Sequence, residues 1–193
     1  MPLSSSDRPA LVLIDIQQSF TDIAYWGGER NNPHAEEKAG DLLAAWRKHN
    51  LPIFHIQHCS ANPVSPLHES QSGNAFKSQV QPLPGEPVLK KNVNSAFIGT
   101  ILQQQLDSAN ITTLVIAGLT TDHCVSTTTR MAGNLGYNTY LAEDATATFN
   151  KTGADGQHFP AALIHETALA SLHNEFATVV TTSYIIQSIE AGS

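Results

Sequence analysis

Apolar residues cluster along this chain in short runs of the kind that form buried strands. The first run extends from Ala10 to Ile14 without a polar break and ends at the carboxylate of Asp15. A strand without polar alternation is buried on both faces, which is typical of parallel sheets. The run from Thr112 to Gly118 is the most apolar of the chain. The same pattern predicts four further strands, at residues 51–56, 87–90, 137–143 and 177–182.

Helical patterns separate these strands. Asn32 and Pro33 open a helix from Ala35 to His49, because proline is favoured in a first helical turn. Another helix follows from Thr121 to Leu135, with Gly136 as its C-cap. Two more are predicted at residues 100–110 and 158–175. The alternation predicts an α/β fold of three layers, helices on both faces of a mainly parallel, Rossmann-like sheet of about six strands.

The second and third predicted strands are joined by a long polar stretch rich in proline and glycine. A connection of this length is more often a functional loop than a simple link. No internal repeat or low-complexity segment interrupts the pattern. We therefore expect a single domain over residues 1–193.

Composition and charge narrow the range of functions. The chain carries 10 Lys or Arg and 17 Asp or Glu, a formal net charge of −7, which argues against a nucleic-acid partner. No apolar run reaches the roughly 20 residues that span a bilayer, and residues 1–9 lack the apolar core of a signal peptide. We expect a cytoplasmic protein that acts on a small molecule, with Cys59 and Cys124 as free thiols.

Three reactive side chains, those of Asp15, Lys91 and Cys124, follow predicted strands. In open α/β sheets the carboxyl ends of the strands lie at one edge, and ligands bind there. The three residues come from strands that are distant in sequence, and the fold brings such strand ends together. This convergence is a stronger indication of a site than any one of the residues.

Cys124 is the candidate nucleophile. Residues 118–125 turn from strand to helix, so the sulfur lies in a first helical turn. Unpaired N–H groups and the positive end of the helix dipole there favour thiolate over thiol. The same N–H groups can stabilise an oxyanion. The competing interpretation is a free cysteine that is merely packed at the start of a helix.

Asp15 and Lys91 favour the interpretation of Cys124 as a nucleophile over that of a packed cysteine. A carboxylate at the end of an apolar strand is costly to bury without a polar partner. Asp15 can accept a thiol proton and later pass it to a leaving group. Lys91 can pair with the carboxylate and favour the thiolate, although the pattern alone leaves Lys90 as an alternative.

Three longer motifs occur in a specific order and spacing. They are LVLIDIQQSF at residues 11–20, NSAFIGT at residues 94–100 after Lys91, and VIAGLTTDHCV at residues 115–125. Gly136–Tyr137 and Glu143–Asp144–Ala145 fit the same order. On these motifs the chain resembles the isochorismatase-like family of cysteine hydrolases, over nearly its whole length.

The resemblance implies an Asp–Lys–Cys triad with Asp15 as general acid and base, Lys91 as charge partner and Cys124 as nucleophile. It selects Lys91 over Lys90, because the family places its lysine four residues before the serine that is Ser95 here. It also implies a cis peptide bond between Leu119 and Thr120. The oxyanion donors implied by the family are the backbone N–H groups of Thr120 and Cys124.

One departure from the wider superfamily concerns metal. Nicotinamidases in this superfamily carry an Asp-x-His pair and a further histidine that bind a metal near the triad. This chain has Gln57–His58–Cys59 at that strand end, with His68 ten residues after His58. Zinc sites usually need three protein ligands, so we expect no metal and no cofactor. His55 and His58 are interpreted as polar residues at a strand edge.

The substrate pocket is expected to form from residues near the triad. Phe20 and Trp26 are candidates to cover the substrate, and Ser95, Phe97 and Thr121 flank the lysine and the cysteine. Ordinary packing explains Phe97 equally well.

The leading hypothesis is hydrolysis of the C–N bond of a small, non-peptide amide through a thioester on Cys124. A first alternative is isochorismatase-type cleavage of a vinyl ether, which needs the acid Asp15 but no nucleophilic sulfur. A second is a catalytically silent protein that binds a small molecule. The resemblance also implies a homo-oligomer, a dimer or a tetramer.

Overall fold

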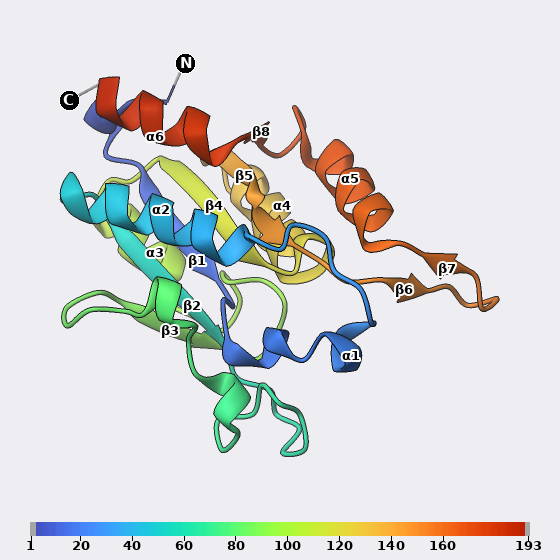
Figure 1. The fold of residues 1–193 in the computed structure, drawn as a ribbon. Helices are drawn as coiled ribbons and strands as arrows, with labels where there is room; N and C mark the ends of the chain where they lie inside the picture. Colours follow the sequence, from blue (N-terminus) through green and yellow to red (C-terminus); the bar gives the residue numbers. More distant parts are fainter. Residues whose placement is uncertain (1–2, 192–193) are drawn as a thin grey trace.

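A parallel sheet forms the centre of the computed structural model, which describes residues 3–191 (Figure 1). Its six strands lie in the order β3-β2-β1-β4-β5-β8, and every neighbouring pair is parallel. Their bounds are β1 Ala10–Ile14, β2 Ile53–His58, β3 Val88–Lys91, β4 Thr113–Leu119, β5 Asn138–Ala147 and β8 Thr178–Val180. The predicted strand number and the mainly parallel sheet are confirmed.

Helices cover both faces of the sheet (Figure 1). On one face, α2 (Ala35–Lys48) and α6 (Thr182–Ala191) pack against Leu11 and Leu13 of β1. On the other, α3 (Leu102–Ser108), α4 (Ser126–Asn134) and α5 (Ala161–Leu172) enclose Val12 and Ile14. Successive residues of a strand face opposite sides, and both sides are buried here. This explains why β1 is apolar at every position.

The sheet changes direction beside β1. The chain passes from β1 outward to β2 and β3, and then returns to form β4 on the other side of β1. β1 and β4 approach closely at Gly118, whose φ is 136° and where a Cβ would overlap the carbonyl oxygen of Ile14. Only glycine adopts this backbone without strain. The ends of β1 and β4 therefore flank the topological switch point, where open α/β sheets bind ligands.

Several element boundaries differ from the predictions. β2 begins and ends two residues later than predicted and includes Gln57 and His58. The predicted helix at residues 158–175 is shorter, because β6 (Lys151–Thr152) and β7 (His158–Phe159) form a hairpin before it. This hairpin projects from the body of the protein (Figure 1). The helix α6 and the short helix α1 (Ile23–Trp26) were not predicted.

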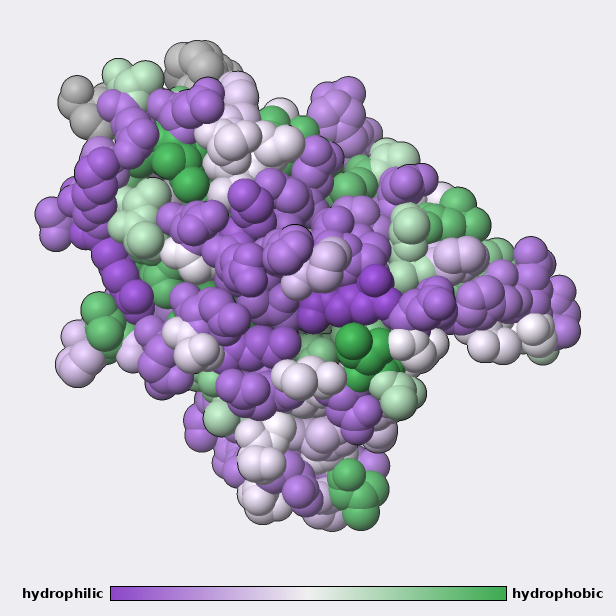
Figure 2. All heavy atoms as spheres, in the orientation of Figure 1, coloured by the Kyte–Doolittle hydropathy of each residue, from purple (hydrophilic) through white to green (hydrophobic). Residues whose placement is uncertain are grey.

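Short helical turns occupy the connections. Four 3₁₀ turns lie at residues 5–7, 18–21, 72–74 and 78–80, and a π-helical turn at Thr121–Val125 leads into α4. The last two 3₁₀ turns are the regular parts of the long connection between β2 and β3. Polar side chains cover most of the face shown in Figure 2, with apolar ones in scattered patches. Across residues 3–191, no helix has the length and apolarity to cross a membrane.

Candidate active site

The three residues predicted from the strand ends meet at the switch point. Lys91 Nζ donates a hydrogen bond to Asp15 Oδ2 at 2.6 Å and another to Cys124 Sγ at 3.3 Å. All three side chains are buried. A buried ammonium thus connects a carboxylate to a thiol, and each charge has a partner of the opposite sign or a polar contact.

Each of these residues owes its position to a strand end. Asp15 directly follows β1 and has a φ of 53°, a left-handed conformation that Asp tolerates better than most residues. Lys91 is the last residue of β3, and its side chain extends past β2 to reach Asp15. Cys124 lies in the π-helical turn after β4. The peptide bond between Leu119 and Thr120, just before that turn, is cis.

The surroundings of Cys124 favour the neutral thiol over the thiolate. Burial raises the pKa of the Cys124 thiol above its ordinary value, the charge of Asp15 raises it further, and Lys91 lowers it by less. The direction of this shift is opposite to the expectation that the helix start and Lys91 favour a thiolate. Desolvation of the charged form outweighs the charge of Lys91. The thiol donates to Asn94 Oδ1 at 3.8 Å, and its proton must leave before or during attack on a carbonyl.

Asp15 has one carboxylate oxygen available for that proton. Its Oδ2 accepts from Lys91, whereas its buried Oδ1 has no hydrogen-bond partner among the described residues. A buried acceptor without a partner costs free energy and is a frequent feature of functional sites. Thr120 Oγ1 is buried without a partner in the same way. Both residues line one cavity, so a bound molecule can satisfy them.

This cavity has a volume of about 220 Å³. Ligand pockets usually measure roughly 300–1,000 Å³, so the volume suits a small molecule. The prediction that Phe20 and Trp26 border the substrate agrees with their place in its wall. Their rings are tilted by 34° with centroids 4.7 Å apart. Trp26 Nε1 donates to the carbonyl oxygen of Ser19 at 2.9 Å, which fixes the indole.

The other three predicted pocket residues do not line this cavity. Ser95 is buried, and its hydroxyl accepts from the backbone N–H of Phe97. The Phe97 ring stacks on Tyr137, with centroids 5.8 Å apart. Thr121 is fully buried, and its Oγ1 lies 2.9 Å from Nδ1 of His165. These contacts are with other parts of the protein, so the three residues pack around the triad segments and do not form the cavity wall.

Sequence reasoning missed much of the cavity wall. His58 was interpreted as a polar residue at a strand edge, yet it lines the cavity and contacts Lys91. His55, given the same interpretation, is fully buried and pairs with Glu86. The remaining lining residues are Ser60, Ser65, Leu67, Asn94, His123 and Lys151. Alternation along β2 was an available signal, because His58 follows Ile56 on the same face.

The group of potential metal ligands at this site does not fit a metal ion. Among the described residues, Asp15, His58 and Cys124 offer ligand atoms within 4.8 Å of one another. The Lys91 ammonium contacts all three side chains and so occupies the space between them. A metal cation there would be repelled by the ammonium at close range. The three side chains fit this ammonium, not a metal.

Comparisons with known proteins identify the family of this chain. The family model of the isochorismatase domain matches residues 9–183. The isochorismatase family protein YrdC of Bacillus subtilis is 47% identical over 180 residues, which cover 93% of this chain and 95% of YrdC. The chain belongs to the isochorismatase family. Since members of this family are hydrolases, the protein is a hydrolase.

Two further relatives cover the isochorismatase-family chain almost completely. The YddQ protein of Bacillus subtilis, of the same family, is 31% identical over 92% of this chain and 98% of its own length. The crystal structure of an isochorismatase-family protein from Chromobacterium violaceum superposes with a TM-score of 0.94 at 44% identity. The superposition covers 99% of this chain and 98% of that one, so the whole fold described here is that of the family.

Proposed function

We propose that this hydrolase cleaves the C–N bond of a small amide through a thioester on Cys124. The observation that carries the proposal is the buried contact of Lys91 with both Asp15 and Cys124, beside an Asp15 oxygen that has no partner. A nucleophile and a proton acceptor then line one small cavity, and the positive charge of Lys91 contacts both. This set of groups is what acyl transfer through a covalent intermediate requires.

In the first half of the reaction, Cys124 Sγ attacks the amide carbon and its proton passes to Asp15 Oδ1. The carbonyl oxygen becomes an oxyanion, which the backbone N–H groups of Thr120 and Cys124 stabilise. The C–N bond then breaks, and Asp15 returns the proton to the departing nitrogen. Lys91 keeps its charge throughout and holds the carboxylate in place.

In the second half, water replaces the amine. Asp15 takes a proton from this water as it attacks the thioester carbon, and the C–S bond breaks. The departing sulfur receives the proton back from Asp15, and the acid leaves. The protein returns to its resting form, with a neutral thiol and an ionised Asp15.

Two more distant relatives carry names that denote hydrolysis of small molecules, and one of these names supports an amide substrate. A streptothricin hydrolase of Streptomyces noursei is 28% identical over 92% of this chain. Nicotinamidase 3 of Arabidopsis thaliana is 26% identical over 91% of this chain, and its name denotes an amide substrate. A vinyl-ether reaction needs no sulfur, whereas here the thiol is held against the Lys–Asp pair.

Turnover of a panel of small amides by wild-type protein and two cysteine variants tests the proposal. We expect Cys124→Ala to lose all measurable turnover, because it lacks the nucleophile. Cys59→Ala is the matched control: Cys59 is the other free cysteine and does not line the cavity, so this variant keeps wild-type turnover. Full turnover of the amides by Cys124→Ala would contradict the thioester mechanism. Cleavage of a vinyl ether by Cys124→Ala but not by Asp15→Asn would support the vinyl-ether type of reaction instead.

Assembly and location remain predictions. We propose that the protein forms a dimer or a tetramer and works in the cytoplasm. Light scattering coupled to size-exclusion chromatography measures the assembly directly. A mass of one chain at assay concentration would rule out the oligomer.

A further inference from the structure

His58 lies on β2, the strand between those that carry Lys91 and Asp15. It is the last residue of β2, and the sheet register pairs it with Lys91 on the edge strand β3. Paired residues of neighbouring parallel strands face the same side of a sheet. To reach Asp15, the Lys91 side chain must pass the end of β2, and on the way it contacts His58 Nδ1 at 3.1 Å.

This contact fixes which ring nitrogen carries the proton. A lysine ammonium has three donors and no acceptor. In contact with it, Nδ1 must act as acceptor and is therefore unprotonated, which leaves the proton of the neutral ring on Nε2. Burial lowers the pKa of His58, the charge of Lys91 lowers it further, and Asp15 opposes this, so the neutral ring is favoured.

The Nε2–H group has no partner in the described part of the chain. Among residues 3–191, no side chain or backbone group hydrogen-bonds to it. The ring is half-buried and lines the cavity. The edge of the ring opposite Lys91 is thus the part that a bound molecule can reach, and it presents a single donor of fixed orientation.

The backbone of His58 is held by buried amides. Gln17, fully buried, accepts from the His58 N–H at 2.9 Å and donates to its carbonyl oxygen at 3.1 Å. Asn74 Nδ2 donates to the same carbonyl at 2.9 Å. Ligand-binding groups need support of this kind to keep their geometry. His58 is therefore fixed at both its backbone and its ring.

The rest of the cavity indicates an uncharged, flat ligand. Lys91 is paired with Asp15, and Lys151 at the rim is paired with Asp122 at 3.3 Å. No charge of the wall is left over to balance an ionic group of the ligand. Phe20 and Trp26 add an aromatic surface against which a planar group can stack.

We propose that His58 selects the substrate by donating its Nε2–H to an acceptor atom of a small, uncharged, planar amide, at a position other than the scissile carbonyl. The assignment of an amide rests on the proposed function. The donor itself, and its preference for ligands with such an acceptor, follow from the Lys91 contact. A ligand that has C–H in place of the acceptor leaves the Nε2–H unpaired and binds more weakly.

Binding to Cys124→Ala tests this, because no turnover interferes. The probes are the three pyridine carboxamides and benzamide, which differ only in a ring nitrogen that replaces C–H. By calorimetry we expect one pyridine isomer to bind roughly fivefold more tightly than benzamide, as one neutral hydrogen bond provides. Adding His58→Phe should reduce this ratio to about one, because phenylalanine has no donor.

Two controls separate recognition from a general structural role. His58→Gln can accept from Lys91 and still donate into the cavity, so it retains part of the preference and also serves if His58→Phe does not fold. His68→Phe makes the same replacement at a half-buried histidine that bonds Ser70 outside the cavity, and it keeps the full ratio.

The outcomes distinguish this inference from the proposed function. No preference for any isomer, including no measurable binding, would overturn the role of His58, as would a ratio unchanged by His58→Phe. Amide turnover that depends on Cys124 would still support the proposed function in that case. Conversely, a preference that depends on His58 without turnover of any amide would retain the recognition site and reject the reaction.

Discussion

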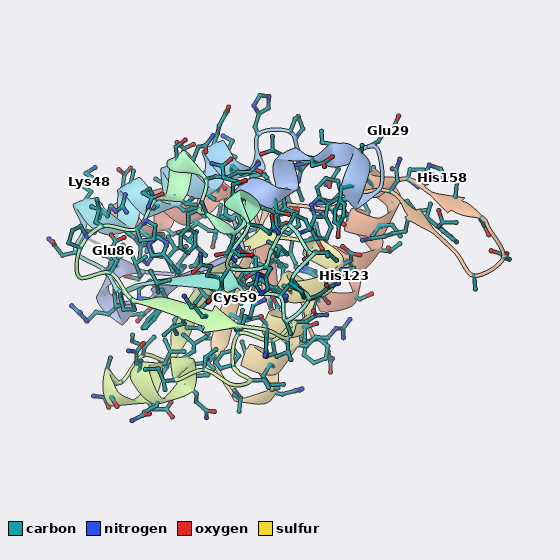
Figure 3. All side chains as sticks on the ribbon, turned by 90° about the horizontal axis from the view of Figure 1, so that it is seen from below. Glu29, Lys48, Cys59, Glu86, His123 and His158 are labelled. Atoms are coloured by element: carbon teal, nitrogen blue, oxygen red, sulfur yellow. The ribbon has the colours of Figure 1, made fainter. Side chains whose placement is uncertain are left out.

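Two clusters of polar side chains, each built around a histidine of β2, contain the same three kinds of residue and have different properties. At the carboxyl end, His58 meets Lys91 and Asp15. Nearer the amino end, His55 meets Glu86, which also pairs with Arg47. Each cluster is a cation, a carboxylate and a histidine. Figure 3 shows Glu86 well apart from His123 of the active site.

The clusters differ in the hydrogen bonds that they leave open. Both oxygens of Glu86 accept from Arg47, and Oε2 also accepts from His55 and from the backbone of Leu83. Asp15 Oδ1 has no partner among the described residues, and Asp15 lines a cavity. His55 Nδ1 is also unpartnered, but it is packed beside Phe76 and no ligand reaches it. Open capacity toward a cavity, not residue type, separates the candidate site from the structural cluster.

Replacing each carboxylate by the corresponding amide should give the largest difference in activity between the two clusters. Asp15→Asn should lower kcat/KM for an amide by about 1,000-fold or more, because an amide cannot carry the proton between sulfur and leaving nitrogen. Glu86→Gln should leave kcat/KM unchanged. Steady-state kinetics, with circular dichroism to verify folding, measures both. Equal losses in the two variants would remove the distinction between the clusters.

Replacing each cation tests how deeply the pairs are buried. Lys91→Met leaves the Asp15 carboxylate buried and unpaired, which should cost roughly 3 kcal/mol or more of unfolding free energy. Arg47→Met should cost only about 1–2 kcal/mol, because its side chain is 29% exposed and water replaces it. Urea unfolding at pH 7 gives both values. A larger loss for Arg47→Met would contradict the burial argument.

The contribution of the Glu86 cluster to the unfolding free energy should depend on pH in the acid range. Hydrogen bonds from Arg47 are the main reason that the pKa of Glu86 falls from 4.5 to about 2. Because the folded pKa is depressed, this stabilisation is complete above pH 4.5 and is lost as pH falls toward 2. It amounts to roughly 2–3 kcal/mol. Unfolding free energy measured from pH 5 to pH 2.5 should fall more steeply in wild type than in Glu86→Gln. Parallel curves would exclude this role of Glu86.

The smallest effect concerns the reactivity of Cys124. The charge of Asp15 raises the pKa of the thiol, so Asp15→Asn should lower that pKa and speed alkylation by iodoacetamide about three- to tenfold at pH 7.5. The rate at Cys59, followed by peptide mapping in the same sample, is the internal control. Slower alkylation of Cys124 in Asp15→Asn would show that Asp15 promotes thiolate formation in the resting protein.

Much of the fold was predictable because its strands are buried on both faces. The unbroken apolar runs of β1 and β4 identify a parallel sheet, and the residues after such strands identify Asp15 and Cys124. α6 was missed although Ile185 and Ile189, four residues apart, are both fully buried. The apolar residues before α6 were attributed to a strand alone.

The cavity wall was less predictable, because it depends on side-chain contacts between distant segments. His58 was interpreted as a polar residue at a strand edge, so it was left out of the predicted pocket. Ser95, Phe97 and Thr121 are close in sequence to Lys91 and Cys124 but do not line the cavity. The pKa of Cys124 also depends on burial, which no local pattern provides.

Trapping the acyl group tests the central claim most directly. At alkaline pH, solvent hydroxide can take the thiol proton in place of Asp15, and an activated ester needs no proton for its leaving group. Such an ester should therefore acylate Cys124 in Asp15→Asn, where hydrolysis of the thioester lacks its base. Intact mass with peptide mapping should then show one acyl group on Cys124 and none on Cys59. A variant that accumulates no acyl group on Cys124, while wild type hydrolyses the corresponding amide, would contradict the thioester mechanism.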